Sequence, residues 1–195
     1  AIEIALDSDK ALATKAATAS SHLTLANGLR LPTLGFGTWQ MKGDACREAV
    51  LNAVGAGYQL IDTGSAYRNE ESVGEALRES PDVSIQSKCS AKEMGYDRAR
   101  NACEATLRRL GRNTIEVYLI HWPAVAKLEL SSCEHRRVRS ETWRALEELY
   151  SEGRVRAIGV SNFTARHLEE LFEDGVRVAP MLNQIEVHPY FADYE

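Results

Sequence analysis

The sequence is poor in cysteine and has no long hydrophobic run, and each shortage excludes a class of protein. Its 195 residues include four cysteines, none in a C-x-x-C pair. This spacing argues against a disulfide framework or a cysteine-rich metal site and is typical of reduced thiols in a cytoplasmic protein. No run of roughly 18 apolar residues, the length needed to cross a bilayer, is present. We therefore expect a cytoplasmic location and no membrane partner.

The chain also lacks an excess of basic residues. Lys and Arg number 23 against 28 Asp and Glu, which gives a net charge of -5. Proteins that bind nucleic acid normally carry a basic face, so no nucleic-acid partner is expected. With 44% hydrophobic and 26% charged residues, the composition is that of a globular protein with one sizeable core.

The first 22 residues are rich in Ala, Ser and Thr, and the chain does not begin with Met. A transit peptide would be poor in acid, and Glu3, Asp7 and Asp9 argue against one. We expect residues 1–22 to be a disordered or processed extension. Residues 23–195 are expected to form one domain.

From Leu23 onward the hydrophobic pattern alternates between strand and helix. Residues 23–31 alternate about Asn27-Gly28, a strong signal for a two-residue β-hairpin turn. Six short apolar strands are then predicted, with five helices between them. The expected strands cover residues 34–39, 58–62, 83–88, 115–121, 155–160 and 181–187. Asn69 can cap the second helix, and the last helix should turn Leu168, Leu171 and Phe172 inward. The third helix, from about residue 97, should end at Gly111 and bury Ala99, Ala102, Cys103, Thr106, Leu107 and Leu110. This order implies a parallel sheet with right-handed crossovers, in either an open doubly wound sheet or a (β/α)8 barrel.

The ends of the strands favour the barrel. An open dinucleotide-binding sheet should show G-x-G-x-x-G after its first strand, but Gln40 stands where the third glycine belongs. Every predicted strand instead finishes on polar or aromatic residues. These residues are Trp39, Asp62, Lys88, His121, Ser161 with Asn162, and Gln184 with Glu186. A barrel brings all its strand ends to one mouth, where active sites form.

Four residues at these ends, Asp62, Tyr67, Lys88 and His121, form a candidate acid–base site. Each has an ordinary explanation when taken singly, such as a turn residue, a rim residue or a core histidine. Their occurrence at matching ends of successive βα units makes function the better interpretation.

The chemistry of such a site follows from elementary electrostatics. A phenol with a pKa near 10 is a slow acid at neutral pH. An ammonium about 4 Å away favours the phenolate by roughly 4 kcal/mol, or about 3 pK units, so we expect Lys88 to lower the pKa of Tyr67. Asp62 would keep the lysine charged, and a neutral His121 could hydrogen-bond a substrate oxygen. This arrangement suits carbonyl reduction, with the hydride supplied by a cofactor.

Several segments resemble the aldo-keto reductases in sequence and in order. They are Leu34–Trp39, Ile61–Tyr67 with Asn69-Glu70, Leu119–Pro123, Gly153–Phe163 and Asn183–Tyr190. The resemblance implies a (β/α)8 barrel that reduces an aldehyde or ketone with NADPH, with no metal. It also implies a monomer when full length, acting on a small-molecule carbonyl substrate.

The resemblance further implies a role for each matching residue. Asp62, Tyr67, Lys88 and His121 fall on the family's catalytic tetrad, with Tyr67 as proton donor. The implied cofactor contacts are Gly37, Thr38, Asp62, Ser161, Asn162 and Gln184. Trp39, His121 and Trp122 would line the substrate pocket.

Two departures from the family pattern are visible. Residues 86–90 lack the aromatic residue that often follows the lysine in this family. The chain also stops after the sixth strand, whereas a barrel of this kind has around 250 residues. We therefore expect about six of eight βα units, a fragment of a longer enzyme. The family's 2′-phosphate-binding segment would lie beyond residue 195, so the residues here do not separate NADP from NAD.

Two other functions remain open. The chain could be a catalytically impaired barrel that binds a cofactor or a protein partner. A metal-dependent barrel hydrolase is the weaker alternative, because it would want paired histidines near the first strand and residues 37–39 contain none. The basic run 135–139 is expected to be a solvated loop.

Overall fold

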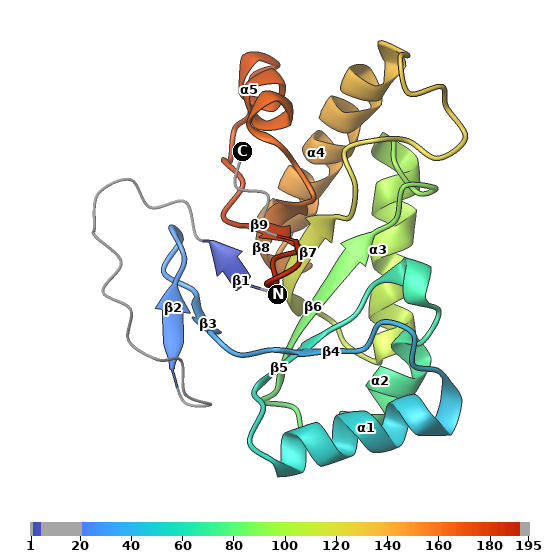
Figure 1. Ribbon diagram of the computed structural model, residues 1–195, viewed down its shortest axis with the longest axis vertical. Helices are drawn as coiled ribbons and strands as arrows, with labels where there is room; N and C mark the ends of the chain where they lie inside the picture. Colours follow the sequence, from blue (N-terminus) through green and yellow to red (C-terminus); the bar gives the residue numbers. More distant parts are fainter. Residues whose placement is uncertain (1, 5–20, 192–195) are drawn as a thin grey trace.

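The computed structural model describes residues 2–4 and 21–191, and a curved sheet runs through its centre (Figure 1). Six strands follow one another in chain order and pair in parallel. They are β4 (Phe36–Gly37), β5 (Leu60–Asp62), β6 (Ser84–Cys89), β7 (Ile115–Ile120), β8 (Val155–Ser161) and β9 (Asn183–Ile185). The prediction of six parallel strands in an incomplete (β/α)8 barrel is confirmed.

Five helices connect these strands and cover the outer face of the curved sheet (Figure 1). They are α1 (Gly43–Gly55), α2 (Glu70–Ala76), α3 (Tyr96–Leu110), α4 (Glu134–Ser151) and α5 (Ala165–Glu173). The main core, which includes the buried rings of Tyr118 and Trp143, lies between sheet and helices. Each described helix is too short or too polar to span a bilayer.

The predicted hairpin is present, but its turn differs from the expected one. Strands β2 (His22–Thr24) and β3 (Arg30–Pro32) pair antiparallel, with Thr24 opposite Arg30. The connection is therefore longer than two residues, and only Gly28 in it has a positive φ, of 84°. The Asn27 amide instead donates to the backbone oxygen of Arg156 at 2.8 Å, which ties the turn to the sheet.

The segment expected to be disordered is only partly described. Residues 2–4 form strand β1 (Ile2–Ile4), which pairs antiparallel with β9, and His22 belongs to β2. Residue 1 and residues 5–20 lie outside the described part of the chain.

Helix α3 agrees closely with the prediction from the hydrophobic pattern, whereas helices α4 and α5 differ from it. The buried positions of α3 are those predicted, and Gly111 ends the helix in the left-handed conformation. Helix α4, however, begins at Glu134, so the expectation of a solvated loop over 135–139 is wrong. His135 and Arg139 are buried in its first turns because neighbouring segments supply their hydrogen-bond partners. In α5, Phe172 was expected to face inward but is 47% exposed.

Candidate active site

Lys88 lies at the centre of the candidate site, on β6, and its side chain is only 2% exposed. Its Nζ donates to Asp62 Oδ1 at 2.5 Å, to the backbone oxygen of Thr63 at 2.9 Å and to the Tyr67 hydroxyl at 3.2 Å. A buried ammonium is stable only when paired, and these three oxygens satisfy its three donors. The structure thus brings together Asp62, Tyr67 and Lys88.

Local structure explains how Asp62 and Tyr67 reach the same lysine. Asp62 ends β5, which is parallel to β6, and a short 3-10 helix over Ser65–Tyr67 follows it at the carboxyl end of the sheet. Arg68 then takes a left-handed conformation, with φ 56°, and the chain turns into α2. This short helix carries the phenol back over the end of β6, within reach of Lys88.

Lys88 acts on the Tyr67 phenol in the expected direction, but the net change in the pKa of Tyr67 is the opposite of the expected one. The pKa of Tyr67 is raised above its ordinary value, mainly because burial penalises the phenolate. The charge of Lys88 lowers this pKa, but Asp62 raises it and offsets part of the effect of the ammonium. Tyr67 is therefore a neutral phenol at pH 7.

His121 follows β7 and contacts Tyr67 edge-on, with ring centroids 5.5 Å apart and planes at 77°. Burial, aided by the charge of Lys88, lowers the pKa of His121 to about 4. The imidazole is therefore neutral at pH 7, as the sequence argument required. Its Nδ1 is buried and has no hydrogen-bond partner among the described residues.

Sequence reasoning missed Gln86, which supports Asp62 from the same strand as Lys88. The Gln86 amide donates to Asp62 Oδ1 at 2.8 Å, and the residue is fully buried. Residues two apart in a strand share a face, so its position two before Lys88 was a signal that could have found it.

Asn69 has a larger role than the helix cap that its position suggested. It is the N-cap residue of α2, yet its side chain makes no capping bond. Its amide instead donates to the backbone oxygens of Thr38 at 2.8 Å and Met41 at 3.1 Å, and its oxygen accepts from the Thr63 hydroxyl at 2.8 Å. This buried residue joins the loop after β4 to the loop that carries Tyr67.

Three of the predicted cofactor residues, Gly37, Asp62 and Gln184, line one pocket of about 180 Å³. A side chain added at Gly37 would meet open space, and the Gln184 amide makes no hydrogen bond to the described residues. Thr38 is different, because it is buried and its hydroxyl donates to the backbone oxygen of Asp62 at 2.9 Å. Gln184 offers this pocket both a hydrogen-bond donor and an acceptor.

Ser161 and Asn162 lie next to this pocket, at the end of β8. The Ser161 hydroxyl donates to the backbone oxygen of Gln184 at 2.8 Å. The Asn162 amide donates to the backbone oxygen of His121 at 2.9 Å, from a residue with φ 61°. Both side chains are thus fixed by neighbouring strand ends, and no described residue donates a hydrogen bond to the Asn162 side-chain oxygen.

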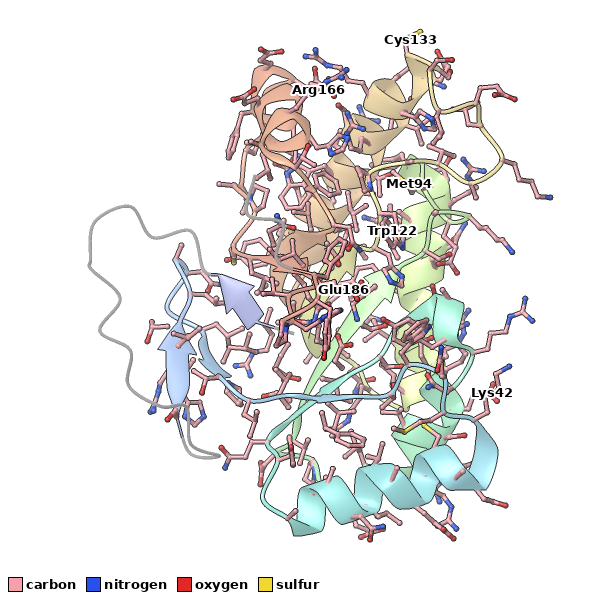
Figure 2. All side chains as sticks on the ribbon, viewed as in Figure 1. Lys42, Met94, Trp122, Cys133, Arg166 and Glu186 are labelled. Carbon is pink, nitrogen blue, oxygen red and sulfur yellow. The ribbon has the colours of Figure 1, made fainter. Side chains whose placement is uncertain are left out.

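Both tryptophans predicted to line the substrate pocket are exposed and are not packed in the core. Trp39 is 67% exposed and Trp122 is 51% exposed. Trp122 stacks on His121, with ring centroids 6.3 Å apart and planes at 23°, and it lies beside the strand ends in Figure 2. Larger cavities lie among the outer helices, away from Tyr67. The described residues contain no cluster of three or more potential metal ligands.

Parallel βα units with polar side chains gathered at the carboxyl ends of the strands define the class of (β/α)8-barrel proteins. Within this class, the model of the Aldo/keto reductase family matches residues 33–195. The chain belongs to the aldo/keto reductase family.

Individual relatives agree with this assignment. The chain is 40% identical over 176 residues to glyoxal reductase of Bacillus subtilis, and 42% identical over 174 residues to the 9,11-endoperoxide prostaglandin H2 reductase of Trypanosoma cruzi. These matches cover 88% and 87% of this chain but only 59% and 57% of the relatives. The chain therefore spans less than two thirds of their length.

Solved structures show the same similarity. An aldo/keto reductase from Brucella melitensis superposes with a TM-score of 0.80 at 40% identity, over 90% of this chain and 66% of that one. A variant of the protein Gox0644, solved in complex with NADPH, gives a TM-score of 0.79 at 38% identity, over 91% of this chain and 61% of that one.

Proposed function

We propose that this chain carries the catalytic residues of a nicotinamide-dependent carbonyl reductase that converts an aldehyde or ketone to an alcohol. Membership of the aldo/keto reductase family supports this reaction class. The observation that carries the proposal is that one ammonium group, that of Lys88, bonds two of the other candidate catalytic residues. Lys88 contacts Asp62 and the Tyr67 hydroxyl at the same time, at the carboxyl ends of the strands.

In this proposal Tyr67 delivers the proton. Its pKa is raised by burial, so the phenol holds its proton at neutral pH until a substrate oxygen gains charge. The phenolate left behind would lie beside the Lys88 ammonium, which stabilises it, and Asp62 keeps the lysine in place. Neutral His121 donates a hydrogen bond to the carbonyl oxygen and orients it.

We propose NADPH as the cofactor, supported by the NADPH complex of the Gox0644 variant. When bound, the nicotinamide supplies the hydride. Gly37, Asp62 and Gln184 would hold it in the pocket of about 180 Å³. Of the other contacts implied by the family, Ser161 and Asn162 would complete the amide site, and Thr38 would act through the loop that it fixes.

The substrate is proposed to be a small aldehyde or ketone held between the exposed faces of Trp39 and Trp122. The four free cysteines, three of them buried, support a reducing compartment such as the cytoplasm. The division into an extension over residues 1–22 and a barrel domain over 23–195 stays a prediction, as does a monomer when full length.

Replacing Tyr67 tests this function. In the full chain, Tyr67→Phe should lower NADPH oxidation with a small aldehyde by roughly 100-fold or more, since it removes a general acid. NADPH binding, followed by fluorescence quenching, should stay nearly unchanged. Tyr58→Phe is the matched control, because its hydroxyl makes no hydrogen bond to the described residues and it lies at the other end of β5.

Retained turnover in Tyr67→Phe would contradict the proposed role. If the wild-type chain bound NADPH but reduced no aldehyde, the alternative of a non-catalytic, cofactor-binding barrel would replace it.

A further inference from the structure

Glu93, in the turn between β6 and α3, holds a carboxylate that the proposed mechanism does not use. One of its oxygens, Oε2, accepts three hydrogen bonds. The donors are the Ser65 hydroxyl at 2.5 Å, the Ser90 backbone N–H at 2.8 Å and the Ser90 hydroxyl at 2.7 Å. Three donors on one oxygen fix the carboxylate in a single orientation.

The other oxygen of Glu93, Oε1, has no partner in the described part of the chain, and the residue is partly exposed. Among the described residues nothing donates a hydrogen bond to Oε1, and no Lys, Arg or His forms an ion pair with Glu93. The buried carboxylate of Glu70 provides a contrast, because Arg109 pairs with it at 2.6 Å. Glu93 is only partly buried, so its charge does not require a partner within the fold, and its fixed carboxylate leaves Oε1 free to pair with a cationic ligand group.

The neighbours of Glu93 place it at the candidate site. Ser65 begins the 3-10 helix that ends at Tyr67, and Ser90 follows Lys88 by two residues. The backbone N–H of His121 donates to the backbone oxygen of Cys89 at 3.0 Å, so the loop after β6 runs beside His121 and Trp122. The charge of Glu93 is felt at the imidazole, where it acts to raise the pKa of His121.

We propose that Glu93 determines substrate specificity by favouring carbonyl compounds that carry a cationic group and disfavouring those that carry a carboxylate. The inference rests on the proposed function, because it assigns a substrate class to the same site. A cation on the substrate would pair with Oε1 while the carbonyl oxygen lies at Tyr67 and His121. A carboxylate in the same place would be repelled.

The size of the effect is expected to be modest because Glu93 is partly exposed. One charge pair at a partly exposed site is worth roughly a few-fold to tenfold in affinity. The comparison therefore needs substrates that have the same shape and differ in charge, and the Glu93→Gln variant corrects for their different intrinsic reactivity. Betaine aldehyde and 3,3-dimethylbutanal meet this need, because a quaternary nitrogen in one replaces a quaternary carbon in the other.

The experiment measures kcat/KM for both aldehydes with the full chain. The wild type should prefer betaine aldehyde by about fivefold relative to the ratio in Glu93→Gln, which keeps the shape of the side chain and removes its charge. Glu79→Gln, which makes the same change on an exposed turn far from Tyr67, should keep the wild-type ratio. An unchanged ratio in Glu93→Gln would overturn the proposal and leave Glu93 as a residue that closes the turn.

A second measurement uses only the wild type, so it tests the proposal even if the Glu93→Gln protein fails to fold. Choline should inhibit the wild type more strongly than its uncharged isostere 3,3-dimethylbutan-1-ol, and raising the salt concentration should reduce the difference. Equal inhibition would overturn the proposal. A wild type that reduces neither aldehyde nor any other carbonyl compound would instead refute the proposed function itself.

Discussion

Tyr67 shows how burial and charge compete at a single residue. The sequence indicated both of its partners, Lys88 and Asp62, and the structure brings all three together. The expected direction of the pKa change was nevertheless wrong, because a strand pattern does not reveal how far a loop residue is removed from water. Desolvation outweighs the attraction of the lysine, whose charge Asp62 partly cancels.

His121 gives a prediction for the pH dependence of stability. Its pKa is about 4 in the folded chain, below the ordinary value of 6.5 that it should regain on unfolding. Between these values the unfolded chain binds a proton that the folded chain does not, so stability should fall as the pH falls from about 6.5 to 4. Between pH 7 and pH 5 this one group should contribute about 1–2 kcal/mol, measurable by urea unfolding.

His121→Asn removes the titrating group and should make the loss of stability between pH 7 and pH 5 smaller by that amount. An equal loss in wild type and His121→Asn would show that the imidazole does not resist protonation in the fold.

At the scale of elements, helices α2 and α3 approach each other at Gly74. A Cβ at this position would lie 2.7 Å from the backbone oxygen of Arg109 and 2.8 Å from the backbone of Leu110. Backbone atoms cannot rotate away as a side chain can, so Gly74→Ala should push the helices apart. We expect a loss of about 1–3 kcal/mol in the free energy of unfolding, measured by urea denaturation.

Gly55→Ala serves as the matched helix variant. Gly55 ends α1, and a Cβ there would meet nothing within 4 Å. This change should be neutral or stabilise the chain by up to about 1 kcal/mol, because alanine is the better helix former. Equal effects of the two substitutions would show that the close approach at Gly74 carries no cost.

The element scale also shows where sequence reasoning succeeds. Helix α3 was predicted down to its buried positions, because its apolar residues recur with helical spacing and Gly111 can end it. The start of α4 was missed because its first turns are charged. Arg139 is buried there only because Pro123 and Glu170, from other segments, accept its hydrogen bonds. Partners so far apart in sequence leave no local pattern to find.

At the scale of the whole molecule, the sheet has a second apolar face that the helices do not cover. Leu25 and Leu31 of the hairpin pack there with four strand residues, Leu60, Val117, Leu119 and Ala157, and with Met181 and Leu182 just before β9. The sequence indicated the hairpin itself, but its seat on this face depends on long-range contacts. The Asn27 bond to Arg156 fixes the hairpin at the end of the sheet away from Tyr67.

This arrangement makes the hairpin part of the folding unit that supports the site. Leu31 is 2% exposed within that inner cluster, so Leu31→Ala should leave a cavity and lower the free energy of unfolding by about 2–5 kcal/mol. Leu23, on the neighbouring strand, is 36% exposed, and Leu23→Ala should cost about 0.5 kcal/mol or less.

Urea unfolding followed by tryptophan fluorescence separates the two variants. All three tryptophans lie outside the hairpin. If their fluorescence changes in one transition at a lower urea concentration in Leu31→Ala, the hairpin stabilises the whole sheet. A Leu31→Ala protein as stable as Leu23→Ala would show instead that the inner face of the sheet holds together without it.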